Sequence, residues 1–102
     1  MGEEKEFKKM YDDLKGLKPL RKGAFLGAEE EKFYVAKTEE EVYELSALAY
    51  YVWLLCDGEH SIEEIADRIS KEVQLEKEEI IEALMLALDG LSNVCLVEFA
   101  YT

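Results

Sequence analysis

The longest apolar stretch of the sequence runs from Leu45 to Gly58 and reads LSALAYYVWLLCDG. It contains the one tryptophan, Trp53, and it has no charged residue between Ala47 and Cys56. An Asp-Gly pair ends it, which is a typical helix stop and turn signal. The stretch is far shorter than the ~20 residues that a membrane-spanning helix needs. We therefore expect a central helix that is covered on most sides, with Ser46 as its N-cap.

An amphipathic pattern precedes this stretch and predicts a helix over Glu3 to Lys15. Its apolar residues recur at the spacing of one helical face: Phe7, Met10, Tyr11 and Leu14. Gly16 and Pro19 end it. Two interpretations are open, a helix docked on the body of the domain and a terminal helix that binds a partner or frays.

The segment from Lys15 to Lys22 is interpreted as a short basic linker, which contacts either an acidic partner or the acidic half of this chain. We divide the chain accordingly into an N-terminal helix and linker (residues 1–22) and a main domain (residues 23–102). With 102 residues and no low-complexity segment, a further domain is not expected.

The pattern then changes to the shorter period of β-strands. Strands are predicted at Ala24–Gly27, Lys32–Ala36 and Glu41–Leu45, and the charged residues 29–31 form a hairpin loop. In the third strand, Val42 and Glu44 are expected to face one way and Tyr43 and Leu45 the other. These strands are expected to form an antiparallel meander that leads into the central helix.

Two more helices are predicted after Gly58. Ser61 and Glu64 form a capping box at the start of the first, whose apolar stripe consists of Ile62, Ile65, Ala66, Ile69 and Val73. The second starts near Glu76, and Gly90 is expected to weaken its end. Its wide apolar face consists of Ile80, Ile81, Leu84, Met85, Leu88 and Leu91.

Residues Asn93 to Tyr101 predict a last strand, in the place where a winged helix has its wing. The predicted fold class is therefore α+β. It is winged-helix-like, with a three-stranded antiparallel sheet followed by three helices, an extra N-terminal helix and a C-terminal strand.

The net charge of −12 is placed unevenly along the chain. Residues 1–37 carry nine Lys or Arg and eight Asp or Glu, whereas residues 38–102 carry three and sixteen. Such a second half would repel a phosphate backbone, so no nucleic acid partner is expected. The charged N-terminus has no signal peptide pattern, which favours a cytoplasmic location without a membrane partner.

The two cysteines and one histidine do not form a metal-binding pattern, so we expect neither a metal nor a cofactor. Cys56 and Cys95 lie in apolar surroundings and are interpreted as buried free thiols, with a disulfide as the alternative.

A set of these residues resembles the PqqD family, over Gly23 to Leu91. The matching positions are Leu45, Ala49, Trp53, Cys56-Asp57-Gly58, Ile62-Glu63-Glu64-Ile65-Ala66, Glu79-Ile80, and Leu84 through Gly90-Leu91. The resemblance implies a RiPP recognition element, a small winged-helix protein that acts as a chaperone in peptide modification. Such proteins bind the leader of a ribosomally made precursor peptide and present it to a modifying enzyme, often a radical S-adenosylmethionine enzyme. They are not enzymes themselves.

The resemblance also implies where the leader binds: as a strand added to the third strand, in a groove closed by the third helix. Carried onto this sequence, the implied peptide-binding residues are Glu41, Val42, Tyr43, Glu44, Leu45, Lys77, Glu78, Ile81, Glu82, Met85 and Leu88. Met85 suits a variable apolar anchor, and the acids favour a basic leader. For Ile81, Met85 and Leu88 the alternative is ordinary core, and for the glutamates it is a solvated face.

Three other functions are alternatives to peptide binding. A winged-helix DNA-binding regulator is disfavoured because no Lys or Arg lies between Glu78 and Leu91. An enzyme would rely on Cys56, Asp57 and His60, but acids and apolar neighbours would raise the thiol pKa. The third alternative is an assembly subunit or homodimer, since the terminal extensions either cover the groove or pair two chains.

Overall fold

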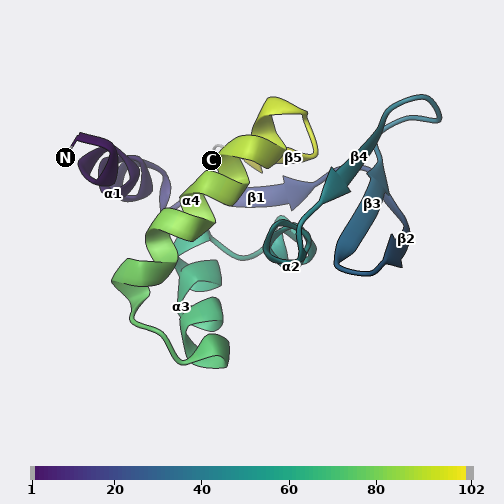
Figure 1. Ribbon diagram of the computed structural model, residues 1–102. Coiled ribbons are helices and arrows are strands. Elements are labelled where there is room, and N and C mark those ends of the chain that lie inside the picture. Colours follow the sequence, from purple (N-terminus) through teal and green to yellow (C-terminus); the bar gives the residue numbers. More distant parts are fainter. Residues whose placement is uncertain (1, 101–102) are drawn as a thin grey trace.

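The computed structural model describes residues 2–100 and has the α+β architecture that the sequence predicts (Figure 1). The elements in chain order are α1 (Gly2–Leu14), β1 (Lys18–Arg21), β2 (Ala24–Glu29), β3 (Lys32–Ala36), β4 (Val42–Leu45), α2 (Ala47–Leu55), α3 (Ile62–Val73), α4 (Lys77–Asn93) and β5 (Val97–Ala100). Tyr101, the end of the predicted last strand, lies outside the described residues. Figure 1 shows the β2–β3–β4 sheet at one end of the molecule and α1 at the other.

The predicted meander is confirmed: β2, β3 and β4 form a three-stranded antiparallel sheet in chain order. The strand order leaves β2 and β4 as the two edge strands. Opposite pairs Val35–Tyr43 and Phe33–Leu45 face the helices, and Val35 and Leu45 are buried. Val42 and Glu44 face the other way and are exposed, as the alternation of side chains along a strand requires.

The central helix is α2, and it connects the sheet to the helical part of the molecule. Ser46 caps it as predicted, because its Oγ accepts a hydrogen bond from the Ala49 N–H at 3.2 Å. Trp53 is only 3 % exposed, and its indole N–H donates to the Lys22 carbonyl at 3.1 Å. Tyr50 stacks on Phe33 of β3 with ring centroids 4.4 Å apart. The helix therefore joins the sheet, the main core and the residue that follows β1.

Helices α3 and α4 begin where the sequence predicts. The capping box is present, with Ser61 N–H donating to Glu64 at 2.8 Å and Glu64 N–H donating to Ser61 at 3.2 Å. The apolar stripe of α3 is buried except at Val73, its last residue, which is exposed. Gly90 does not end α4, because the helix continues to Asn93.

The segment predicted to be a basic linker instead contains β1, which pairs antiparallel with β5 in a second sheet. The other edge of β1 is occupied as well, since Arg21 N–H donates to the Cys56 carbonyl at 2.7 Å and Gly58 N–H donates to the Pro19 carbonyl at 2.8 Å. Lys22 Nζ lies 3.5 Å from Glu98, so part of this basic segment lies against the acidic half of the same chain.

The N-terminal helix is docked on the domain. Tyr11 is buried, and the other apolar residues of its stripe are partly buried against the core. The two cysteines differ: Cys56 is a buried free thiol as expected, whereas Cys95 is free but exposed, which corrects the expectation for it. In the described residues, no helix combines the length and the apolar character required to cross a membrane.

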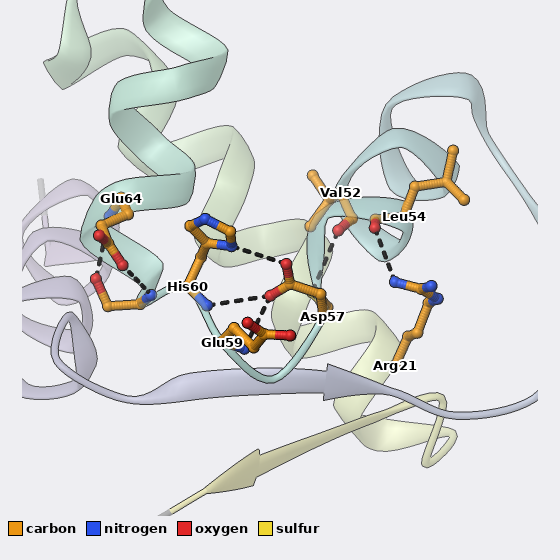
Figure 2. Close-up of polar contacts among 9 residues, drawn as sticks. Arg21, Val52, Leu54, Asp57, Glu59, His60 and Glu64 are labelled. Atoms are coloured by element: carbon orange, nitrogen blue, oxygen red, sulfur yellow. Dashed lines mark hydrogen bonds and ion pairs between the residues drawn. The ribbon is translucent and has the colours of Figure 1, made fainter.

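The turn between α2 and α3 is held by Asp57, whose carboxylate faces His60 and the backbone of Glu59 (Figure 2). It accepts from the backbone N–H of Glu59 at 2.9 Å and of His60 at 3.0 Å, and it lies 2.7 Å from the His60 ring. These contacts, the Glu59 N–H first, lower the pKa of Asp57 to about 2. The interactions of the Cys-Asp-Gly-Glu-His segment are thus those of a structural turn.

Candidate functional site

The outer edge of β4 carries backbone groups that β3 does not use. Lys37 N–H donates to the Glu41 carbonyl at 2.8 Å, which fixes the phase of the β3–β4 ladder. Hydrogen-bonded pairs alternate along antiparallel strands, so Tyr43 and Leu45 bond to β3. The N–H and C=O groups of Val42 and Glu44 point away from it. Among the described residues, no backbone hydrogen bond of a turn, loop or helix cap uses these groups.

A groove lies between this strand and the C-terminal half of α4. Its cavity has a volume of about 310 Å³. It is lined by Tyr43, Glu44, Leu45, Ser46, Ala49, Leu86, Ala87, Gly90, Leu91 and Val94. Most of these residues are apolar, and the exposed side chain of Leu86 stands at one wall. The free edge and the apolar groove therefore occupy the same place.

The structure places most of the predicted strand residues at this groove and the predicted helix residues away from it. Tyr43, Glu44 and Leu45 line the groove, although the side chains of Val42 and Glu44 lie on the other face of the strand. Glu41 directly precedes β4. The six predicted residues of α4 do not line this groove.

Two of those six residues are core. Met85 and Leu88 are each only 1 % exposed, so neither can contact a peptide unless α4 moves. Lys77 lies between helices, 2.9 Å from Asp67 of α3. The other three, Glu78, Ile81 and Glu82, line a separate cavity beside α1.

Comparison with known proteins gives one family. The model of the PqqD family, described as coenzyme PQQ synthesis protein D, matches residues 29–97. This chain belongs to the PqqD family. Comparison with curated proteins and with solved structures gives no match. Membership supports a role in peptide modification, in which the PqqD family acts as an accessory component.

The extra elements of this PqqD-family chain leave the groove open. α1 packs against the part of α4 that holds Glu78 to Glu82, and β5 pairs with β1. Neither element contributes a lining residue to the groove. Among the described residues, the extensions therefore do not cover the edge of β4.

The residues of α4 that line the groove also form a pattern in the sequence, but this pattern is weaker than the apolar stripe of the same helix. Ala87, Gly90 and Val94 recur at helical spacing, and these small side chains leave space next to the large Leu86. The strongest apolar pattern of α4 marks the face that it buries against the core. The groove lies on the neighbouring face, where small residues alternate with one exposed leucine.

The charged residue that lines the groove, Glu44, is acidic, and Glu41 directly precedes the same strand. The Tyr43 hydroxyl donates to the Glu41 carboxylate at 3.2 Å. Burial and this hydrogen bond raise the pKa of Tyr43, so it stays neutral and can donate. The Glu44 carboxylate is exposed and makes no ion pair within the described residues. A cationic ligand group would therefore meet a carboxylate that no cation of the described residues neutralises.

The alternative site at Cys56 lacks the geometry of a nucleophile. Its Sγ donates to the Val52 carbonyl at 3.2 Å, and burial raises its pKa to about 12. The thiol is thus protonated at neutral pH, while His60 lies against Asp57 (Figure 2). In the part of the chain that the structure describes, no cluster of three His, Cys, Asp or Glu side chains could hold a metal ion.

Proposed function

We propose that this PqqD-family chain binds the leader of a precursor peptide by strand addition along β4 and presents it to a modifying enzyme of the radical S-adenosylmethionine type. The observation that carries the proposal is the free edge of β4 beside an open apolar groove. Extended peptides add to such edges through main-chain hydrogen bonds, and pockets for alternate side chains provide specificity. Family membership supports the peptide-modification context.

The backbone groups available for this addition are the N–H and C=O groups of Val42 and Glu44. A peptide strand would lie ~4.8 Å beyond β4 and bond to both residues. These bonds do not depend on peptide side chains, so they bind extended peptides of any sequence. Selectivity then comes from the groove and from Glu44.

The acidity of residues 38–102 favours a partner with positive charge. With three basic and sixteen acidic residues, this part of the chain attracts basic peptides and accelerates their encounter. The same charge disfavours nucleic acid, whose phosphates are bound by Lys and Arg.

The decisive substitution is Val42→Pro. Proline removes the N–H that points to the free edge, and edge strands tolerate it because no ladder bond is lost. For a peptide selected from a displayed library on the wild-type chain, we expect about five- to 150-fold weaker binding. This corresponds to the roughly 1–3 kcal/mol cost of an unsatisfied acceptor. Isothermal titration measures the change.

The matched control is Ala28→Pro on the opposite edge of the same sheet. Ala28 stands opposite Phe33 of β3, between ladder residues, so its N–H also points outward. We expect the control to bind the selected peptide with wild-type affinity. Equal affinities of Val42→Pro and wild type, with both proteins folded by circular dichroism, would overturn strand addition at β4.

A further inference from the structure

We propose that Gly90 determines the size of the peptide side chain that enters the groove, and that Glu44 selects a Lys or Arg at the adjacent peptide position. This inference rests on the proposed function. It assigns to this chain two specificity-determining residues, Gly90 in the groove and Glu44 with its side chain on the opposite face of β4. It also defines the ligand class: an extended peptide with a bulky apolar residue directly next to a basic one.

The phase of the β3–β4 ladder fixes which peptide residues face which way. Because side chains of paired strands lie on the same face when they stand opposite each other, a peptide residue opposite Tyr43 faces the groove. Its neighbour in sequence stands opposite Val42 or Glu44 and faces the outer side of the sheet. This alternation holds whether the peptide runs parallel or antiparallel to β4.

The backbone at Gly90 does not require a glycine. The positive-φ glycines of the described residues are Gly23 and Gly58, and Gly90 lies within α4, where glycine is unfavourable relative to alanine. A Cβ built at Gly90 meets no atom within 4 Å, so close packing does not explain the glycine either. What the missing side chain provides is space in the groove.

The resulting space suits one bulky side chain. The cavity of about 310 Å³ lies at the lower end of ligand pockets, which span roughly 300–1,000 Å³. Leu86 stands on one side of Gly90 and Val94 on the other, and the ring of Tyr43 belongs to the strand wall. A leucine or aromatic side chain of the peptide would be largely removed from water there, which is worth at least about tenfold in affinity.

Glu44 lies where it can select the adjacent residue. Its side chain is exposed and stands opposite the uncharged Tyr34 on β3. The peptide would occupy its other side, where directly opposed side chains have Cβ atoms ~5 Å apart. A Lys or Arg at that position pairs with Glu44, whereas an acid is repelled. Because the pair is exposed, the expected preference is only about two- to fivefold.

The test is selection of short peptides from a random displayed library on four purified variants and the wild-type chain. The variants are Gly90→Leu, Gly90→Ala, Glu44→Lys and, as a matched charge control outside the groove, Glu82→Lys. Thermal unfolding checks that each variant is folded. If Gly90→Leu does not fold, Gly90→Ala alone tests the role of Gly90. Sequencing of the enriched peptides reports the preference at each position.

The wild-type chain is expected to enrich peptides in which a bulky apolar residue stands next to Lys or Arg. Gly90→Leu should shift the apolar position to Ala or Val, with at least about tenfold loss of the bulky residue, and Gly90→Ala should shift it less. Glu44→Lys should change the preference for Lys or Arg into a preference of about two- to fivefold for Asp or Glu, whereas Glu82→Lys should leave the preference for Lys or Arg unchanged.

Two other outcomes are distinguishable. If Val42→Pro loses peptides that the wild type enriches, but the Gly90 and Glu44 variants keep the wild-type preference, strand addition stands and this inference is wrong. If the wild type enriches no peptide, or enriches the same peptides as Val42→Pro, the proposed function is wrong, and the inference that rests on it is wrong as well.

Discussion

Replacing Trp53 by alanine is expected to lower the free energy of unfolding by about 3–5 kcal/mol. The indole is 3 % exposed, its N–H donates to the Lys22 carbonyl, and the Arg21 guanidinium lies 5.9 Å from the ring centroid. A large cavity would therefore open between α2 and the strand β1. Since domains of this kind are stable by about 5–15 kcal/mol, the loss is a large fraction of the total stability.

Denaturant unfolding followed by far-UV circular dichroism measures this loss without the tryptophan signal. Trp53→Phe is the matched control, because it keeps one aromatic ring but removes the N–H donor, at a smaller expected cost of about 1–3 kcal/mol. A Trp53→Ala protein with the wild-type midpoint would contradict the position of α2 at the centre of the core.

Replacing Met85 by alanine is expected to cost about 2–5 kcal/mol of stability and to leave the peptide affinity of the folded protein unchanged. The adjacent Leu86 should behave in the opposite way. Leu86 is 58 % exposed and lines the groove, so Leu86→Ala should change stability by only about 0.5 kcal/mol or less while it weakens binding.

The two variants are compared by denaturant unfolding and by titration with the same selected peptide. They are neighbours on α4, so a shift of the helix would affect both. If Met85→Ala kept its stability and lost affinity, Met85 would be the peptide anchor that the family resemblance implied, and the groove lined by Leu86 would not be the peptide site.

Much of the fold could be predicted because its signals are local. Ser46, Ser61 and Glu64 satisfy backbone N–H groups within one turn of their own helix. The alternation in β4 likewise reports which side of this strand faces the core. Such patterns depend little on distant parts of the chain.

The strand β1 could not be predicted in this way, because its partner is distant in sequence. Of its four residues only Pro19 is buried, so Lys18 to Arg21 show no alternation, and a proline argues against a strand. The strand exists because β5 and residues 56–58 provide hydrogen-bond partners on its two sides.

The residues of α4 that line the groove could not be predicted from the sequence for the same reason. The periodicity of α4 identifies Leu84, Met85 and Leu88 as an apolar face, but it does not say which neighbour covers that face. The core covers it. The free edge of β4 was predictable from strand order, whereas the helix residues across from it depend on how α4 packs.

The most direct measurement is amide hydrogen exchange at β4, followed by NMR with and without a saturating selected peptide. We expect the N–H groups of Val42 and Glu44 to become protected on binding by about tenfold or more. Those of Tyr43 and Leu45 already bond to β3 and should change little. If the peptide binds while Val42 and Glu44 exchange as rapidly as before, the peptide does not add as a strand to β4.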